Sequence, residues 1–494
     1  MRFTPDPVQF WARVTPDRPA LQRGDASWTY GRLNDAIQES ADALIAQGLG
    51  AGEHVSLEFV PAHAFSFVIA FHALQRIGLL PVPIGASLPP EERQALRKRA
   101  FVDLALTSES SDTERGMEEA PALGVGVLPP TEVGPRLLRR LDTPAALCFT
   151  SGTSGEPRGC VLTHGNFFWS ALASARNLGV RAGDLWLSCL PLHHVGGLSI
   201  LTRSAYYGTE VLLHDRFDPE GVLDAIDRQG VTLISLVPPL LERLLRARGG
   251  RIFPTTLRAA LIGGGPCPPE LLMEAAELRL KALPTYGLTE AASQVTTLSP
   301  RIWPAGLDTS GRPLPFIKVE IRDHNGVKAP RGAEGEIVVS GPTVMAAYFE
   351  EREKDAQSWD GRWFKTGDIG AWDAAGRLVV LDRRSDRMVV GGENVSPAEV
   401  ERALRSHPAV LEIAVAGISS GAWGHEVAAA VVLRPGASVT LNELRDHALE
   451  TLATFKLPRR IKIVRELPRS ASGKLLRDAL RDLFRDEVLE EKPA

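Results

Sequence analysis

The stretch CFTSGTSGEPRGC, residues Cys148–Cys160, is the most informative in the chain, because it sets glycines and hydroxyl side chains around one cation, Arg158. Glycines let backbone N–H groups converge on an anion, hydroxyls donate further hydrogen bonds, and a cation offsets negative charge. The stretch follows an apolar run (Ala145–Phe149) and precedes a helical pattern (Gly165–Asn177). It therefore predicts a phosphate-binding loop between a strand and a helix. The spacing is not that of a Walker loop, and an exposed surface turn remains the alternative.

Short apolar runs alternate with helical patterns on both sides of this loop, up to about residue 300. This alternation favours an α/β fold with largely parallel sheets. The expected strands are Val55–Val60, Asp103–Thr107, Ala145–Thr150, Glu210–His214, Thr232–Val237 and Ala259–Ile262. The expected helices include Arg32–Gln47, Gly221–Gln229 and Pro239–Arg246.

The pattern changes after about Ser310, where strands joined by Gly, Pro and Asp turns indicate a smaller β-rich subdomain. A polar segment, residues 382–387, follows, and beyond it the chain has a compact α+β pattern. A chain of 494 residues is too long for one hydrophobic core, since single cores stop growing at roughly 250–300 residues. We therefore predict a large N-terminal domain, residues 1–384, of α/β subdomains plus the β-rich subdomain, and a small α+β C-terminal domain, residues 385–494.

The composition argues against several classes of protein. The net charge of -4 gives no sign of a nucleic-acid-binding protein, which is usually basic. Four widely spaced cysteines without a CxxC pair indicate neither a disulfide framework nor a zinc site, and they fit a reducing cytoplasm. The N-terminus has no apolar core of signal-peptide length. The most apolar stretch, Ala64–Ala86, is broken by polar residues and prolines, so we expect a buried helix followed by a strand and no membrane segment.

Further blocks with possible chemistry follow other apolar runs. The block Pro191–Gly197 carries adjacent histidines, His193 and His194, which fit either a metal site or packed side chains. The run Gly263–Gly265 ends an apolar strand, where either a flat ligand lies against the backbone or the chain simply turns.

Three later blocks carry groups suited to a nucleotide. Glu290 suits a Mg²⁺ ligand, because Mg²⁺ on phosphates takes one or two carboxylates, and the neighbouring Tyr286 offers a face to an aromatic base. Asp368 follows a tight turn and can accept hydrogen bonds from both ribose hydroxyls. Lys474 follows a flexible Ser/Gly stretch that would let it reach a phosphate. The structural alternatives are a helix N-terminal acid, a turn aspartate and a surface lysine.

Taken together and in this order, the blocks resemble the adenylate-forming superfamily of acyl-CoA synthetases, peptide-synthetase adenylation domains and luciferases. The resemblance extends over almost the whole chain, from Trp28 to Lys474. It implies an enzyme that uses ATP and Mg²⁺ to activate a small carboxylic acid as an acyl-adenylate and then transfers the acyl group to CoA. It also implies that the C-terminal domain rotates between these half-reactions, with Ser385 as the hinge.

The resemblance assigns roles to individual positions of this sequence. The catalytic residues implied are Lys474, His194, Thr289 and Glu290, the last as the Mg²⁺ ligand. The ATP-binding residues implied are Thr150, Ser151, Gly152, Thr153, Ser154, Gly155, Arg158, Gly263, Gly264, Gly265, Tyr286, Gly287, Asp368 and Arg383. The CoA-binding residues implied are Gly391, Gly392 and Glu393.

Two stretches narrow the acid. Val195–Arg203 and Thr289–Ser299 look like the corresponding stretches of o-succinylbenzoate–CoA ligases of menaquinone biosynthesis, which implies Arg203, His194 and Ser293 as substrate residues. Chemistry agrees in outline, because a guanidinium buried in an apolar helix needs an anionic partner, and the second carboxylate of a diacid would supply one. A structural Asp or Glu beside Arg203 is the alternative.

Some positions depart from the family pattern. Arg158 replaces the usual Lys of the phosphate loop, and Gly196 stands where the subgroup often has Ser. Three other functions therefore stay open: another aryl- or fatty-acyl-CoA ligase, an enzyme that loads a carrier protein, and a nucleotide-binding regulator without catalysis. The sequence also leaves a homodimer open.

Overall fold

The computed structural model describes residues 2–108, 118–119, 138–150, 157–383, 388–390, 393–420, 424–469 and 475–485. The chain divides into two compact units. The first comprises Met1–Val319, Val338–Lys365 and Ala375–Leu378, and the second Glu320–Ile337, Thr366–Ala374 and Val379–Ala494. The predicted boundary between residues 384 and 385 lies outside the described residues.

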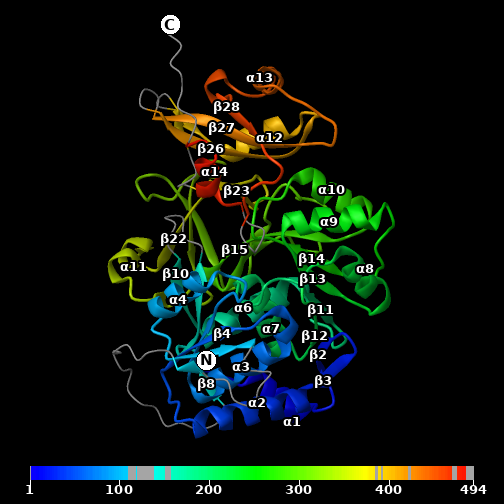
Figure 1. Cartoon of the computed structure of the whole chain (residues 1–494), viewed down its shortest axis with the longest axis vertical. Coiled ribbons are helices and arrows are strands. Elements are labelled where there is room, and N and C mark those ends of the chain that lie inside the picture. Colours follow the sequence, from blue (N-terminus) through cyan, green and yellow to red (C-terminus); the bar gives the residue numbers. More distant parts are fainter. Residues whose placement is uncertain are drawn as a thin grey trace. The chain divides into compact units, whose positions relative to one another are not determined.

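A nine-stranded sheet organises the first unit, in the order β17-β16-β15-β14-β13-β11-β12-β2-β3 (Figure 1). The central strands, from β15 to β2, are mutually parallel, and antiparallel strands close both edges. The α/β prediction with largely parallel sheets is thus confirmed for this sheet. Its strands are β2 (Pro19–Arg23), β3 (Ala26–Thr29), β11 (Leu185–Ser188), β12 (Glu210–Leu213), β13 (Leu233–Leu236), β14 (Ala259–Ile262), β15 (Ala282–Leu288), β16 (Ser293–Thr297) and β17 (Arg312–Pro313).

Helices cover both faces of the sheet. On one face, α8 (Pro219–Arg228), α9 (Pro238–Arg248) and α10 (Pro269–Glu277) pack their apolar side chains against β11, β13, β14 and β15 in one continuous core. On the other face lie α6 (His164–Leu178) and α7 (Val195–Tyr207) (Figure 1). Opposite faces are expected because the crossovers β11–α7–β12 and β12–α8–β13 run in opposite directions along the sheet, and crossovers between parallel strands are right-handed in nearly all proteins.

The helix boundaries follow local chemistry. Thr163 and Asn166 form a reciprocal capping box at the start of α6, which satisfies two backbone N–H groups. Helix α7 ends at Gly208, whose φ of 66° lies in the left-handed region that glycine adopts without strain.

A second, smaller sheet and four α-helices build the N-terminal part of this unit. The sheet runs β5-β4-β6-β7, and a short ribbon pairs β1 with β8. The apolar stretch after Ala64 forms a buried helix and then a strand, as predicted. The elements are β1 (Phe3–Pro5), α1 (Pro7–Val14), α2 (Tyr30–Ala46), β4 (His54–Glu58), η1 (Pro61–His63), α3 (Ala64–Ile77), β5 (Leu80–Pro83), α4 (Pro90–Arg99), β6 (Leu104–Thr107), β7 (Glu118–Glu119) and β8 (Leu138–Arg140).

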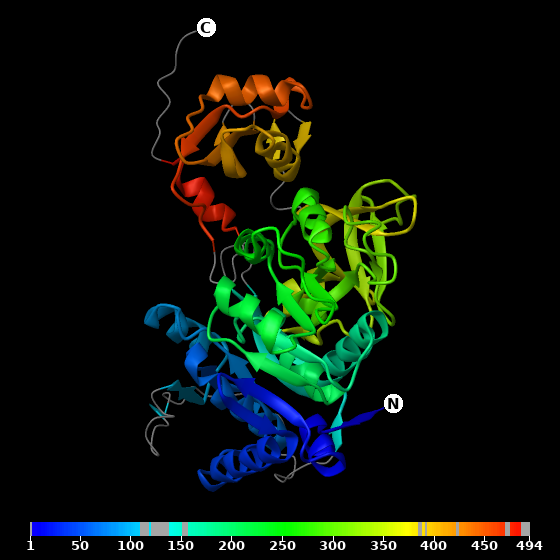
Figure 2. The same ribbon diagram turned by 90° about the vertical axis from the view of Figure 1, so that its right-hand side faces the viewer.

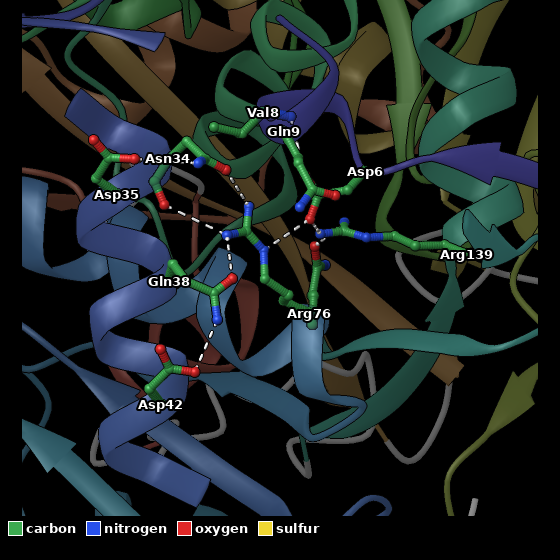
Figure 3. Close-up of polar contacts among 10 residues, drawn as sticks. Asp6, Val8, Gln9, Asn34, Asp35, Gln38, Asp42, Arg76 and Arg139 are labelled. Carbon is green, nitrogen blue, oxygen red and sulfur yellow. Dashed lines mark hydrogen bonds and ion pairs between the residues drawn. The ribbon is translucent and has the colours of Figure 1, made fainter. Parts of the chain in front are cut away.

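A buried charge cluster joins four of these elements (Figure 3). Asp6 caps α1 through the backbone N–H groups of its first turn, and its carboxylate also pairs with Arg76 of α3 at 3.2 Å and Arg139 of β8 at 2.6 Å. Arg76 reaches α2 as well, where it donates to Asn34 at 3.0 Å. One carboxylate thus holds two guanidinium groups in the interior.

Three strands carry the predicted phosphate loop, in the order β20-β10-β9. A strand that was not predicted lies between this loop and the helix expected after it. The chain first forms β10 (Arg158–Thr163), antiparallel to β9 (Pro144–Thr150), and only then α6. Cys160 of β10 is paired with Tyr348 of β20 (Ala347–Tyr348).

The predicted β-rich subdomain is a sheet in the order β18-β19-β22-β21, with β23 beside β22. The elements are β18 (Lys318–Arg322), β19 (Gly335–Ser340), α11 (Arg352–Ser358), β21 (Trp359–Asp360), β22 (Trp363–Trp372) and β23 (Leu378–Arg383).

The C-terminal part of the second unit is α+β, as predicted. Helices α12 and α13 pack on one face of its sheet, and α14 packs on the other face against small alanines (Figure 2). The elements are β24 (Met388–Val390), β25 (Glu393–Val395), α12 (Pro397–Arg405), β26 (Val410–Ser420), β27 (Gly424–Leu433), α13 (Leu441–Leu449), η3 (Thr454–Lys456), β28 (Arg460–Ile463) and α14 (Arg477–Asp482). Within the described part of the chain, no helix is long and apolar enough to cross a bilayer.

Candidate active site

The parallel strands of the large sheet bring several predicted blocks to one edge. Because β11, β14 and β15 are parallel members of one sheet, the segments after their carboxyl ends lie at the same edge. These segments hold His193, the run Gly263–Gly265 and Glu290. Ligands of open α/β sheets bind outside the carboxyl ends of the strands, so this edge is the candidate site.

The glycine run and Tyr286 come from neighbouring strands. Ile262, the last residue of β14, is paired with Pro284 of β15, which places the two blocks side by side. A β-carbon at Gly263 would lie 2.7 Å from the side chain of Thr285, and Gly264 has a φ of 81°. Both positions therefore require glycine, whereas nothing crowds Gly265. Tyr286 itself is buried.

Gly287 is needed for a different reason. The strand has a bulge between Tyr286 and Gly287, and a β-carbon at Gly287 would clash with the backbone oxygen of Ser293. Ala292, which follows the intervening turn, and Ser293, the first residue of the facing strand, have positive φ values of 50° and 94°. This irregular pairing directs the chain after Tyr286 into a short 3₁₀ turn, η2 (Thr289–Ala291).

The two ends of the phosphate loop are held next to each other. Thr150 and Arg158 are cross-strand partners in the antiparallel pair of β9 and β10. Ser151, Gly152, Thr153, Ser154 and Gly155 lie outside the described residues.

A network of polar contacts surrounds Arg158. The Arg158 guanidinium lies over the ring of Tyr348, 5.3 Å from its centroid, and its Nε is 3.9 Å from the carboxylate of Glu351. The Tyr348 hydroxyl donates to Glu290 Oε1 at 2.7 Å. Glu351 also pairs with Arg99 at 2.5 Å. The loop cation and the predicted Mg²⁺ ligand therefore share one neighbour, Tyr348.

The two histidines stack at the start of α7. Their ring centroids are 4.2 Å apart, and His194 is the residue before the first helical turn. Burial, together with the neighbouring His194, lowers the pKa of His193 to about 3. His193 also packs against Gly85, where a β-carbon would lie 2.9 Å from its Nε2. His193 is thus a neutral packed side chain.

Arg203 lies on α7, 2% exposed. Its Nη2 donates to the Ser170 hydroxyl at 3.2 Å, and its Nε has no hydrogen-bond partner among the described residues. Among the residues that the structure describes, no Asp or Glu pairs with the Arg203 guanidinium. Burial lowers the pKa of Arg203 to about 10. The interior thus holds a cation whose counter-ion is not one of the described acidic side chains.

The two stretches predicted to bind the acid come together in space. Ser199 and Arg203 are four residues apart on α7 and share one helix face. Ser199 Oγ lies 3.4 Å from Ser293 Oγ, while Ser170, which contacts Arg203, donates to the Ala292 carbonyl at 2.8 Å. Side-chain contacts through α6 and α7 therefore link Arg203 to Ser293, so the two predicted stretches border the same part of the interior.

The remaining predicted residues belong to the second unit. Asp368 is 6% exposed on β22, and its backbone N–H donates to the Thr366 hydroxyl at 3.1 Å. The strand bends just before it, at Gly367, which has a φ of 73°. Glu393 is exposed at the start of β25. Ser385, Gly391, Gly392, Lys474 and the side chain of Arg383 lie outside the described residues.

Sequence comparison identifies the family. The AMP-binding enzyme family matches residues 8–349, and the C-terminal domain of AMP-binding enzymes matches residues 399–474. The chain belongs to the AMP-binding enzyme family. Its relatives include a 2-succinylbenzoate–CoA ligase of Bacillus licheniformis, 40% identical over 95% of this chain and 98% of the relative. The same enzyme of Bacillus cereus is 36% identical over 98% of this chain and the whole relative.

Solved structures of family members agree. The o-succinylbenzoate CoA synthetase of Bacillus subtilis in complex with its acyl-adenylate intermediate has a TM-score of 0.87 and 36% identity, covering 98% of this chain and 99% of that one. The same enzyme with ATP and a magnesium ion has a TM-score of 0.86 and 35% identity, covering 97% of this chain and all of that one. The expected fold, a large N-terminal and a small C-terminal domain, is therefore that of the family.

Sequence reasoning missed three residues of this site: Ser170, Tyr348 and Glu351. Ser170 and Tyr348 contact predicted residues from distant segments, and nothing in their local sequence signals those contacts. Ser199 lies inside a stretch that was singled out, but only the spacing of four to Arg203 could have marked it.

Proposed function

We propose that this protein is an ATP-dependent 2-succinylbenzoate–CoA ligase, which forms an acyl-adenylate and then the CoA thioester, 2-succinylbenzoyl-CoA. The observation that carries the choice of acid is the buried Arg203, for which no described Asp or Glu serves as counter-ion. An uncompensated buried guanidinium is costly, so an anionic ligand is its natural partner. The diacid has a carboxylate to activate and a second one to bind.

The first half-reaction is a problem of charge. A carboxylate is a poor electrophile, and it must approach the α-phosphate of ATP, which is also an anion. Arg158 and Lys474 would neutralise phosphate charge, while the loop residues 150–155 would hold the phosphates through backbone N–H groups and hydroxyls. Positioning and electrostatics supply most of the acceleration in such a displacement.

Glu290 fits a Mg²⁺ ligand. A single carboxylate beside a phosphate loop suits Mg²⁺, which on nucleotides takes one or two carboxylates and keeps the phosphate oxygens as its other ligands. The ion would supply Lewis-acid stabilisation of the developing charge. Gly263–Gly265 and Tyr286 would hold the adenine, and Asp368 the ribose.

In the second half-reaction a thiol attacks the acyl carbon and AMP leaves. We infer that rotation of the C-terminal domain about Ser385 exchanges Lys474 for a CoA-binding surface that includes Gly391, Gly392 and Glu393. We prefer CoA to a carrier protein as acceptor, because the relatives named above are CoA ligases.

The test is an acid panel with pyrophosphate and thioester readouts. We expect ATP, Mg²⁺ and CoA to give a thioester with 2-succinylbenzoate and much less with benzoate or a fatty acid. Turnover of a monoacid without turnover of the diacid would make the protein another acyl-CoA ligase. Pyrophosphate release without CoA thioester would indicate a carrier-protein acceptor, and no pyrophosphate with any acid would indicate a non-catalytic nucleotide-binding protein.

We also infer a cytoplasmic location, which the four cysteines support: each has a free thiol, and three of them are buried. Light scattering of the purified chain would decide whether it forms the homodimer that the sequence leaves open.

A further inference from the structure

Tyr348 stands between two charged groups of the proposed nucleotide site. Its hydroxyl donates to Glu290 Oε1 at 2.7 Å, and its ring faces the Arg158 guanidinium at 5.3 Å. The side chain is buried, so both contacts are made away from bulk water, where a hydrogen bond to a charged group is strong.

The direction of this hydrogen bond follows from the chemistry of the two groups, because a carboxylate can only accept. The Tyr348 hydroxyl is therefore the donor to Glu290.

The backbone around Tyr348 is fixed from several sides. Its own N–H donates to Asp355 at 3.0 Å, and Phe349 N–H donates to the Gly159 carbonyl at 2.8 Å. On the other side, Met345 N–H donates to the Glu290 carbonyl at 2.7 Å. Residues 345–349 thus form a brace, attached both to the strand that carries Arg158 and to the turn that carries Glu290.

We propose that Tyr348 is a positioning residue for nucleotide binding: its hydroxyl orients Glu290 toward the Mg²⁺ of Mg·ATP, and its ring orients Arg158 toward the phosphates. This inference rests on the proposed function. It assigns separate tasks to the two parts of one side chain. The hydroxyl acts mainly on the contribution of the metal through Glu290 and has a smaller interaction with Arg158, whereas the ring affects ATP with or without metal.

The separation can be measured by calorimetric titration of the full chain with ATP, in the presence and absence of Mg²⁺ and without any acid, so that no reaction occurs. In Tyr348→Phe, we expect the enhancement of ATP affinity by Mg²⁺ to fall roughly tenfold, the effect of losing one charge-assisted hydrogen bond, with metal-free affinity within about twofold of wild type. In Tyr348→Leu, metal-free affinity should also fall, by roughly fivefold, because Arg158 loses its aromatic partner.

Two controls distinguish positioning from general stability. Tyr30 is also buried, and its hydroxyl donates to the carbonyls of Ser204 and Thr209, away from the charged groups named here. Tyr30→Phe should therefore lower the melting temperature without changing either ATP affinity. In a Glu290→Gln background, Tyr348→Phe should have no further effect on the Mg²⁺ enhancement.

The proposal is overturned if Tyr348→Phe retains the full Mg²⁺ enhancement, if it weakens ATP equally with and without Mg²⁺, or if its effect persists in the Glu290→Gln background. Wild-type protein that does not bind ATP would overturn the proposed function itself, and the wild-type titration reveals that outcome separately.

Discussion

Replacing Arg203 by Met removes the buried charge while keeping most of the side-chain volume. Burial lowers the pKa of Arg203 from its ordinary value to about 10. Below both values the side chain is charged in the folded and the unfolded chain, so the full penalty applies near neutral pH and amounts to ~3 kcal/mol. The hydrogen bond to Ser170 returns ~1 kcal/mol. Arg203→Met should therefore stabilise the ligand-free protein by ~2 kcal/mol.

The same substitution should damage catalysis selectively. Loss of one partner of a buried charge pair costs ~2–5 kcal/mol, so kcat/KM for 2-succinylbenzoate should fall by roughly 30-fold or more. Poor monoacid substrates should be affected far less, because they have no second carboxylate. The assays are urea unfolding without ligands and pyrophosphate release with both acids.

Arg248 is the matched control, since it is also a buried arginine but pairs with Asp227 at 2.6 Å. Arg248→Met should destabilise the protein and leave the diacid-to-monoacid ratio unchanged. Destabilisation by Arg203→Met, together with equal losses on both acids, would refute the ligand role and make Arg203 a structural residue.

Three further predictions concern the buried charges and the second unit. Asp6→Asn should lower the free energy of unfolding by ~3–5 kcal/mol, because Arg76 and Arg139 lose their shared carboxylate; a loss below ~1 kcal/mol in urea titrations would contradict this. Burial, together with Arg139, lowers the pKa of His72 to about 3. As the pH falls from 6.5 toward 3, His72 is protonated in the unfolded chain but stays neutral in the folded protein, so the folded protein loses stability. His72→Gln should remove ~1.4 kcal/mol per pH unit from that slope between pH 6.5 and 5, and an unchanged slope would contradict the assignment. Lys474→Ala should abolish pyrophosphate release but still form thioester from pre-made acyl-adenylate; unchanged pyrophosphate release would exclude its proposed role.

The strand and helix pattern was predictable because it is a local property. The apolar strand Ala259–Ile262 is followed directly by glycines, and amphipathic helices have their own period, so such elements could be identified without their neighbours. The strand Arg158–Thr163 was missed, since its first residues belong to the glycine-rich motif and have the composition of a loop.

The ordered motifs, from the loop at Thr150 to Lys474, established by themselves the AMP-binding enzyme family. The tertiary structure alone decided what lies beside each of their residues. Tyr348 meets Glu290 across 58 positions of sequence, and Ser199 meets Ser293 across 94. Such contacts depend on the crossovers that set the strand order and place α6 and α7 on one face of the sheet, and no local pattern encodes them. Arg203 shows the difference most clearly: the sequence marked a charge in an apolar helix, but only the folded chain showed that no described acidic side chain neutralises it.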